Sequence, residues 1–242
     1  MENRLLLSLS ASDLASLTAH LSWIAVPQGA VLHGPEGQIN TVYFPLSGVV
    51  SLHAVMNDGQ AIEIACIGRE GAVGLSSASA LRPAFTRAVV QVPGFAMAIP
   101  SSVLSVMIGQ SEQMRDLVAR YGSVLLAQTQ QLAACNALHS VEQRVARWLL
   151  QLADRTGTAD LSATHGTISR FLGVRRTTVT LVARNLQRDG IIHYNRGNIE
   201  IRDPKGLQSR SCECYDAWRR AEASFEQHDL PPTAWQNEEL RA

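Results

Sequence analysis

The stretch GVRRTTVTLVARNLQRDG, residues 173–190, places two arginines and a run of threonines at the start of an apolar repeat, between two glycines. The apolar residues recur at i, i+3, i+4 and i+7, which predicts one buried face of an α-helix; they are Val179, Val182, Ala183 and Leu186. The opposite face would carry Arg176, Thr177, Thr180 and Arg184. Such a segment is either an amphipathic helix with an ordinary polar surface or a helix that reads DNA.

The segments on either side of this stretch favour DNA reading. Before it, residues 164–172 (THGTISRFL) predict a short first helix, and Gly173 supplies the turn because a residue without Cβ turns most easily. After it, residues 191–194 and 199–202 are typical of two strands around the turn NRGN. A hairpin directly after a recognition helix is a wing, and Arg196 at its tip would lie near a phosphate backbone. Together these parts predict a winged helix-turn-helix.

Eight residues of this unit are predicted to contact DNA. Short polar side chains let a helix sit deep in a major groove, while arginine reaches guanine edges or phosphates. The eight candidates are Arg175, Arg176, Thr177, Thr178, Thr180, Leu181, Arg184 and Arg196. Arg176 is the strongest candidate for base contact. Arg175 stands where a small capping residue is common, so it either contacts phosphate or is an ordinary exposed arginine.

Charge is distributed unevenly along the chain, although its 242 residues have a formal net charge of zero. Residues 140–202 hold ten arginines and five acidic residues, a net charge of +5, whereas residues 1–139 and 203–242 carry −2 and −3. One basic segment in an otherwise acidic chain is typical of a local nucleic-acid footprint. Chance clustering is the alternative explanation on charge alone.

The N-terminal half has a different sequence pattern. Residues 3–23 predict a leucine-rich helix. From residue 26 to about residue 99, short apolar runs are separated by glycines at short intervals, which is typical of a β-sandwich or barrel. The tripeptide NDG at residues 57–59 predicts a hairpin between two strands.

A long helical pattern follows over residues 112–137. Its single apolar stripe suits either a core helix or a helix that also pairs with a second chain. Ser140 and Gln143 then form the pattern of a capping box, which predicts the start of a second domain.

These features resemble the Crp/Fnr family of bacterial transcription regulators over about residues 5–215, most specifically in HSVEQRVARWLL (139–150) and LGVRRTTVTLVARNLQRDGII (172–192). The resemblance implies an α+β fold with a β jelly-roll sensor domain like those that bind cyclic nucleotides, over residues 1–110. It further implies a long dimerisation helix (111–138), a winged helix-turn-helix DNA-binding domain (139–215) and a C-terminal tail (216–242). The implied partners are double-stranded DNA with a two-fold site, a second copy of the chain, and RNA polymerase.

Two departures from the family pattern lie on the recognition helix. Members often carry an acidic residue where this chain has Thr177, and a second arginine is common where it has Leu181. An acidic side chain there would accept from cytosine, whereas leucine can touch a thymine methyl. We therefore expect a target sequence different from that of the best-known members.

The sensor domain departs further. Nucleotide-binding members carry a Gly-Glu pair and, after a loop, an arginine followed by a hydroxyl residue; the glutamate holds the ribose and the arginine pairs with the cyclic phosphate. The matching positions here are Gly74 with Leu75 and Arg87 with Ala88, so only the arginine is retained. Loss of the glutamate removes about 1.5–3 kcal/mol per charge-assisted hydrogen bond. We expect these four residues to form a ligand pocket that does not bind cyclic nucleotides tightly.

Four cysteines are too few for a disulfide scaffold in a chain of this length. Cys66 and Cys135 are expected in the core, and Cys212 and Cys214 form a Cys-x-Cys pair without a matching Cys/His pair, a weak metal signal. No cysteine precedes Cys66, so the N-terminal iron–sulfur cluster of one branch of the family is not expected. We expect no bound metal and no required cofactor; the role of the Cys-x-Cys pair stays open.

Other classes of protein are disfavoured. No apolar run approaches the roughly 20 residues of a membrane helix, and the first residues lack the basic start and long apolar core of a secretory signal. We therefore expect a cytoplasmic protein without a membrane partner. No nucleophile elbow, metalloprotease, phosphate-loop or dinucleotide motif occurs, so we expect no enzymatic activity.

The sequence thus predicts a homodimeric, sequence-specific DNA-binding transcription regulator. Its DNA binding would be constitutive or modulated by a small ligand other than a typical cyclic nucleotide, and the identity of that effector is unknown. One alternative is a cyclic nucleotide-responsive regulator. Another is a sensor that acts mainly by protein contact, with vestigial DNA binding.

Overall fold

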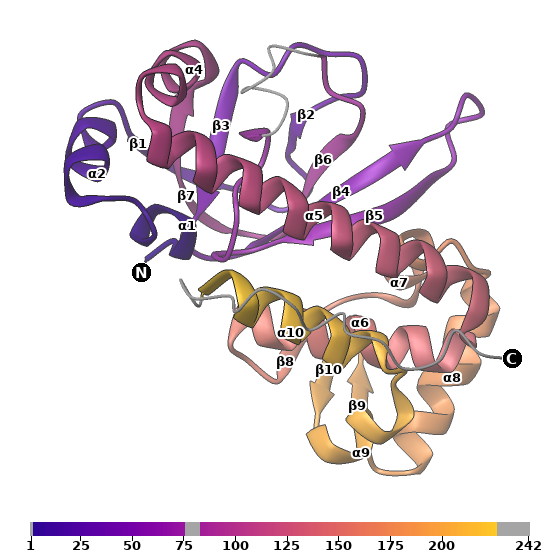
Figure 1. The fold of residues 1–242 in the computed structure, drawn as a ribbon. Helices are drawn as coiled ribbons and strands as arrows, with labels where there is room; N and C mark the ends of the chain where they lie inside the picture. The colour runs from indigo at the N-terminus through magenta and orange to yellow at the C-terminus, as the bar shows by residue number, and fades with distance from the viewer. Residues whose placement is uncertain (1, 76–82, 227–242) are drawn as a thin grey trace, which may run out of the picture.

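The computed structural model describes residues 2–75 and 83–226. Its N-terminal part is a β-sandwich, and the long helix α5 (Glu112–Leu138) crosses from it toward a smaller C-terminal domain (Figure 1). The sandwich strands are β1 (Ser22–Val26), β2 (Val31–His33), β3 (Thr41–Pro45), β4 (Val49–Val55), β5 (Ala61–Ile67), β6 (Arg87–Val92) and β7 (Gly94–Pro100). They form antiparallel sheets of order β1-β7-β3 and β2-β6-β4-β5, which confirms the predicted fold class.

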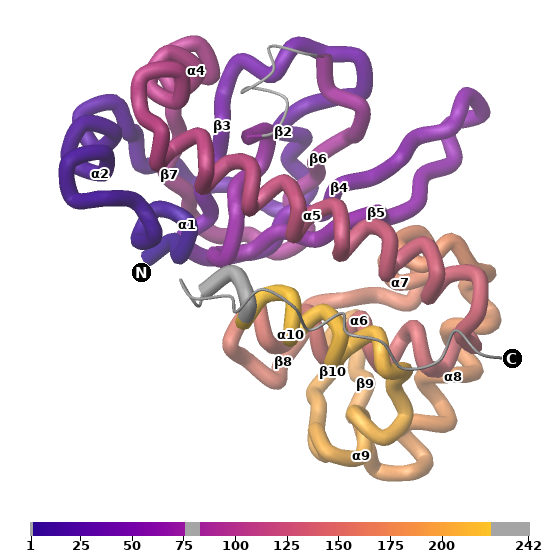
Figure 2. The backbone as a smooth tube through the Cα atoms, viewed as in Figure 1, coloured from indigo at the N-terminus to yellow at the C-terminus, as the bar shows by residue number. Residues whose placement is uncertain are grey.

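The predicted hairpin at residues 57–59 joins β4 to β5. Gly59 has φ +84°, a conformation that favours glycine, and the two strands pair antiparallel from Val55 opposite Ala61 onward. The buried face of β5 carries Glu63, Ala65 and Ile67, while the alternate side chains are half-buried. The tip of the β4–β5 hairpin extends beyond the rest of the sandwich (Figure 2), and β5 also contacts the C-terminal domain.

The single helix predicted over residues 3–23 is wrong. Two short helices, α1 (Arg4–Leu7) and α2 (Ala11–Thr18), precede β1, which already begins at Ser22. The break has a local cause, because the Ser10 side chain accepts a hydrogen bond from the backbone N–H of Asp13 and so starts a new helix. The leucine spacing did not reveal this cap.

Helix α5 follows α4 (Ser101–Gln110) and is close to the predicted long helix. The Ser111 hydroxyl accepts from the backbone N–H of Met114 and caps α5. The apolar stripe lies against the sandwich core: Met114, Leu117 and Tyr121 are buried, and the Tyr121 hydroxyl donates to the Ala72 carbonyl at 2.9 Å. The apolar stripe is therefore part of the hydrophobic core of this chain.

A different face of α5 is exposed. Its residues recur every three or four positions, the spacing of a helix-pairing seam. They include Ala119, Ser123, Leu126, Gln130, Ala133 and Ala137. Leu126 is 58% exposed despite its size.

The described part of the C-terminal domain contains five helices and three strands. In order they are α6 (Val141–Thr156), β8 (Asp160–Ser162), α7 (His165–Leu172), α8 (Arg176–Arg188), β9 (Ile192–Asn195), β10 (Asn198–Ile201), α9 (Pro204–Arg210) and α10 (Cys214–Glu226). The predicted capping box of Ser140 and Gln143 is present at the start of α6. The three strands form one antiparallel sheet of order β8-β10-β9.

The predicted C-terminal tail over residues 216–242 requires correction. Residues up to Glu226 form α10, which packs beside α5 and α6, with Tyr215 and Trp218 buried. Aromatic burial therefore fixes this segment in the domain core. The remaining residues of the predicted tail, 227–242, lie outside the described part. Within residues 2–75 and 83–226, no helix combines the length and the apolar character needed to cross a membrane.

The two domains contact each other directly. The Arg155 Nε of α6 donates to Glu70 Oε1 of the N-terminal domain at 2.8 Å, and both side chains are largely buried. The imidazole of His53 in β4 stacks on Phe171 of α7 with ring centroids 5.2 Å apart. The first contact joins α6 to the segment that follows β5, and the second joins α7 to the β4–β5 hairpin.

The stacked His53 predicts a pH-dependent stability. Burial, followed by the charges of Arg87 and Arg170, lowers the pKa of His53 from its usual 6.5 to about 4. Below pH 6.5 the unfolded state therefore binds a proton that the folded state does not bind. The free energy of unfolding decreases as the pH is lowered from 6.5 to 4. We expect His53 to cost about 2 kcal/mol at pH 5 relative to pH 7.

Urea unfolding of the wild type and His53→Phe at the two pH values checks this prediction. Phenylalanine retains a ring against Phe171 but does not titrate. The variant should lose part of the pH dependence that the wild type shows. Because other histidines titrate in both proteins, equal pH dependence would show that His53 is not a source of it.

Candidate DNA-binding interface

Helices α7 and α8 form the predicted helix-turn-helix. The Thr164 side chain caps α7 by accepting from the backbone N–H of Thr167 at 3.0 Å. The helix ends at Gly173, which has φ +62°, and the backbone N–H of Val174 donates to the Ser169 carbonyl at 3.0 Å. The chain then enters α8, with Arg175 at the N-cap position.

Arg175 lies where the sequence analysis placed it, and its side chain makes no capping hydrogen bond. The side chain is exposed. The positive end of the α8 dipole therefore lies beside an exposed guanidinium. Both features attract a phosphate.

The two faces of α8 divide as the sequence pattern predicts. The four apolar residues of the repeat, Val179, Val182, Ala183 and Leu186, are all buried. Five of the predicted contact residues are exposed on the other side of the helix and at its start: Arg175, Arg176, Thr177, Leu181 and Arg184. Leu181 is 60% exposed, which is unusual for leucine and leaves its methyl groups available to a partner.

Thr178 and Thr180, the other two predicted contact residues of α8, are half-buried. The Thr180 hydroxyl also forms hydrogen bonds within the protein. It donates to the Arg176 carbonyl at 3.0 Å and lies 3.0 Å from His165 Nδ1. A hydroxyl has one proton, so the remaining bond is formed with the imidazole N–H as donor. Thr180 therefore joins α8 to α7.

His165 is a site residue that the sequence analysis missed. Its ring stacks on Tyr194 of β9 with centroids 4.1 Å apart, so it links α7, α8 and the wing. Burial, then the charges of Arg176 and Arg184, lower the pKa of His165. No spacing rule connects residues 165, 180 and 194, so only the fold reveals this contact.

The wing is present as β9 and β10, with Arg196 exposed at the tip. Arg196 has φ +44° and Gly197 has φ +89°, as expected for a tight two-residue turn. The backbone N–H of Tyr194 donates to Gln187 Oε1 at 2.8 Å and fixes the wing beside α8. Arg196 is therefore held at a defined position next to the recognition helix.

The arginines of this surface differ in how they are paired. Arg188, Arg202 and Arg210 form ion pairs with neighbouring acidic residues. Among the described residues, the ion pairs do not include Arg175, Arg176, Arg184 or Arg196. Four unpaired cations lie on α8, at its start and on the wing, which favours a polyanionic partner.

Gly173 provides a test of how this unit is held. A Cβ on Gly173 would lie 3.0 Å from the Ile62 Cδ1 of β5, whereas a Cβ on Gly157, with φ +68°, would have nothing within 4 Å. Alanine costs about 1–2 kcal/mol at either positive φ. We expect Gly173→Ala to destabilise more than Gly157→Ala in urea unfolding, because only the former disturbs the contact with β5. Equal losses would show that this contact is not tight.

The four predicted ligand-pocket residues have different surroundings in the described part of the chain. Leu75 and Ala88 are buried in two different hydrophobic clusters. Arg87 pairs across the β4–β6 ladder with His53. Gly74 has φ +87°, and a Cβ there would clash with Ile39 at 2.8 Å. The loop between them, residues 76–82, lies outside the described part.

Comparison with known proteins adds to this geometry. A family model described as a Crp-like helix-turn-helix domain matches residues 143–210. The chain is 29% identical over 182 residues to the transcriptional regulator SdrP of Thermus thermophilus, covering 72% of this chain and 86% of that protein. It is 25% identical over 182 residues to the global nitrogen regulator of a Nostoc species, covering 72% and 82%.

A solved structure shows the same fold over most of the chain. A putative transcriptional regulator of the Crp/Fnr family from Eubacterium rectale superposes with a TM-score of 0.69 at 22% identity, covering 86% of this chain and 98% of that one. The likeness extends across both the cyclic nucleotide-binding-like sandwich and the helix-turn-helix domain. Residues 143–210 therefore match a Crp-like helix-turn-helix domain, and the chain as a whole is similar to transcription regulators of the Crp/Fnr family.

Proposed function

We propose that the protein binds a two-fold DNA operator as a homodimer, with α8 in the major groove and the wing on the phosphate backbone. The observation that carries this proposal is the group of four arginines, Arg175, Arg176, Arg184 and Arg196, exposed and without ion pairs among the described residues. Arg176 is the proposed base-reading residue, while Thr177 and Leu181 beside it give the site its own sequence preference.

The exposed face of α5 supports the dimer. Small side chains such as Ala119, Ala133 and Ala137 allow a second helix to approach closely, and Leu126 supplies apolar area at the centre. A two-fold axis along this helix would present two copies of α8. Two recognition helices fit successive major grooves when they are about 34 Å apart.

Salt dependence of DNA binding tests this proposal against the alternative of a sensor with vestigial DNA binding. Each phosphate contact releases counterions, so affinity for duplex DNA should fall steeply as salt rises. The measurement is fluorescence anisotropy with a labelled duplex over a salt series. Absence of binding at low salt would favour the alternative, in which RNA polymerase or another protein is the main partner.

The proposed effector is a small ligand other than a cyclic nucleotide, or none. Burial of Leu75 supports this, because an apolar side chain that packs in a hydrophobic cluster with α5 stands at the position that would hold a ribose hydroxyl. Arg87 alone could still pair with a phosphate. A cyclic nucleotide-responsive regulator is therefore the second candidate.

Thermal shift with cyclic AMP and cyclic GMP distinguishes these two candidates. A ligand at one hundred times its dissociation constant adds about 2.7 kcal/mol to stability. We expect neither nucleotide to raise the melting temperature of the protein. A clear, saturable rise with either one would overturn the interpretation of Leu75.

A further inference from the structure

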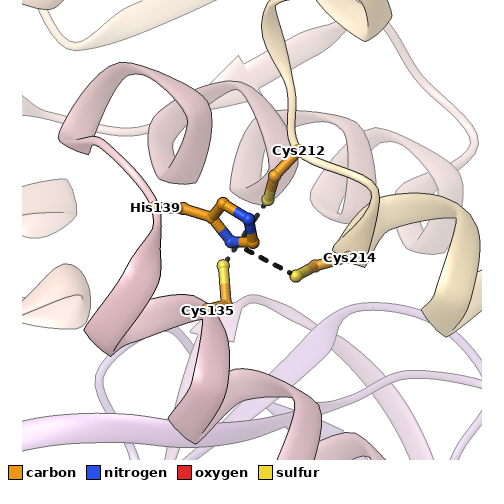
Figure 3. A group of neighbouring side chains, drawn as sticks. All are labelled: Cys135, His139, Cys212 and Cys214. Carbon is orange, nitrogen blue, oxygen red and sulfur yellow. Dashed lines mark hydrogen bonds between the residues drawn. The ribbon is translucent and has the colours of Figure 1, made fainter. Parts of the chain in front are cut away.

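Three cysteine side chains and one histidine side chain from two distant segments meet beside the junction of α5 and α6 (Figure 3). Cys135 lies in the last turn of α5, and His139 is the residue at which that helix ends. Cys212 and Cys214 lie between α9 and the start of α10. One donor atom from each residue falls within 4.8 Å of all the others. The fold thus supplies the Cys/His pair that the Cys-x-Cys pair lacks in its own part of the sequence.

Two separations between the donor atoms are close to the edges of a tetrahedral zinc centre, and the others are within 4.8 Å. Zinc binds thiolate at about 2.3 Å and imidazole nitrogen at about 2.0–2.1 Å, so the tetrahedron has edges of about 3.8 Å between sulfurs and about 3.6 Å between sulfur and nitrogen. The Sγ atoms of Cys135 and Cys212 are 3.5 Å apart. The Cys214 Sγ is 3.5 Å from His139 Nδ1.

We propose that Cys135, His139, Cys212 and Cys214 bind one Zn²⁺ ion in a structural Cys₃His site. Thiolate and imidazole are the ligands that zinc prefers in tetrahedral structural sites. Each cysteine would release its thiol proton to solvent on binding the metal.

The surroundings of the four ligands suit this role. His139 Nε2 lies 3.2 Å from Glu213 Oε1, so the carboxylate accepts from one ring nitrogen and leaves Nδ1 free to bind the metal. The side-chain amide of Gln131 donates to the Cys214 Sγ at 3.0 Å. Glu213 and Gln131 are not ligands themselves, but their hydrogen bonds orient two of the four ligand side chains.

Positive charge is available to offset three thiolates. Arg144 and Arg147 of α6 are buried and lie close enough to Cys135 for their charges to interact with its thiolate. The Nε atoms of both arginines are buried and have no hydrogen-bond partner among the residues that the structure describes. A zinc ion with three thiolates and one imidazole carries a net charge of −1, which these cations would balance.

Burial identifies the kind of site. The three cysteines are between 0% and 4% exposed, and all four ligand positions come from the protein, so no position is open for a substrate. An iron–sulfur cluster holds several irons and spreads its thiolates around them, whereas these donors surround one point. A disulfide between Cys135 and Cys212 would leave Cys214 and His139 without a role.

The position in the fold indicates what the metal would do. Two ligands end the long helix α5, and two begin α10, the helix that packs against α5 and α6. The ion would therefore fix the DNA-binding domain at the point where the chain leaves α5. Metal binding itself does not depend on the proposed DNA binding, so the two can fail independently.

Metal content of the full-length protein tests the proposal. Protein purified under reducing conditions and supplied with zinc, then desalted, should contain one zinc per chain by mass spectrometry. The double variant Cys212→Ser/Cys214→Ser should contain none, whereas Cys66→Ser should retain one, because Cys66 lies on β5 outside the cluster. Cobalt loading of the wild type should give the absorption of tetrahedral cobalt thiolate.

A variant that keeps all four ligands tests the site without the risk that the protein fails to fold. Glu213 is 76% exposed, so Glu213→Gln should fold normally yet bind zinc about 10–100-fold more weakly, as other removals of such partners do. Glu200→Gln, at another surface ion pair, is the matched control and should bind like the wild type. Folded wild type with no zinc above background, equal zinc loss in Cys66→Ser, or a metal-free Cys135–Cys212 disulfide would each overturn the proposal.

Discussion

Arg176→Ala is expected to weaken binding to the preferred duplex by about 30-fold or more and to reduce its preference over unrelated DNA. A bidentate arginine–guanine contact contributes about 1–3 kcal/mol of discrimination, and a dimer makes it in both half-sites. Arg176 is exposed at the first turn of α8 and has no ion pair among the described residues, so its loss should leave the fold intact. Competitive binding of specific and random duplexes measures both quantities.

Two further variants distinguish base reading from general electrostatics. Arg196→Ala on the wing should weaken binding uniformly across sequences and reduce the salt slope by about 1, because a phosphate contact carries no sequence information. Arg220→Ala removes an exposed arginine of α10, outside the recognition helix and the wing, and should have little effect. If Arg176→Ala behaves like Arg196→Ala, Arg176 contacts phosphate and does not read a base.

Glu70→Ala is expected to destabilise the protein by about 3–5 kcal/mol, because it leaves the Arg155 guanidinium buried without its carboxylate. The Arg155 side chain is 3% exposed, and its Nε donates to Glu70 at 2.8 Å. Although burial opposes the charged form, the Glu70 carboxylate keeps the pKa of Arg155 above its usual value. Glu70 Oε1 also accepts from the backbone N–H of Gly68, so the substitution loses a second hydrogen bond.

A double-mutant cycle isolates this interaction. Arg155→Met retains much of the side-chain volume against Trp218, whose ring lies 4.4 Å from the Arg155 guanidinium carbon. The double variant Glu70→Ala/Arg155→Met should be more stable than the sum of the two single losses predicts, since no unpaired charge remains. Additive losses in urea unfolding would show that the two residues do not stabilise each other.

The parts of the fold that depend on local sequence were predictable. The NDG turn, the capping box of Ser140 and Gln143, the apolar repeat of α8 and the wing each depend on residues within a few positions of one another. The break between α1 and α2 is also local, but the leucine spacing obscured the cap at Ser10.

The remaining features depend on contacts between distant residues. Glu70 and Arg155 are 85 positions apart, and Cys135 and Cys212 are 77 positions apart. No periodicity connects such pairs, so neither the contact between the domains nor the cysteine–histidine cluster could be predicted. The surroundings of the predicted ligand-pocket residues were unpredictable for a similar reason, because the sequence match says nothing about where Leu75 and Ala88 pack.

Selection of binding sites from a random duplex library tests the central claim most directly. The purified protein is incubated with the library, and the bound duplexes are sequenced. The experiment is done once without added effector and once with cell extract as a source of small ligands. We expect enrichment of a two-fold symmetric site whose half-sites are one helical turn apart, about 34 Å. Enrichment of no sequence under either condition, or of a single half-site without symmetry, would contradict a dimeric, sequence-reading regulator.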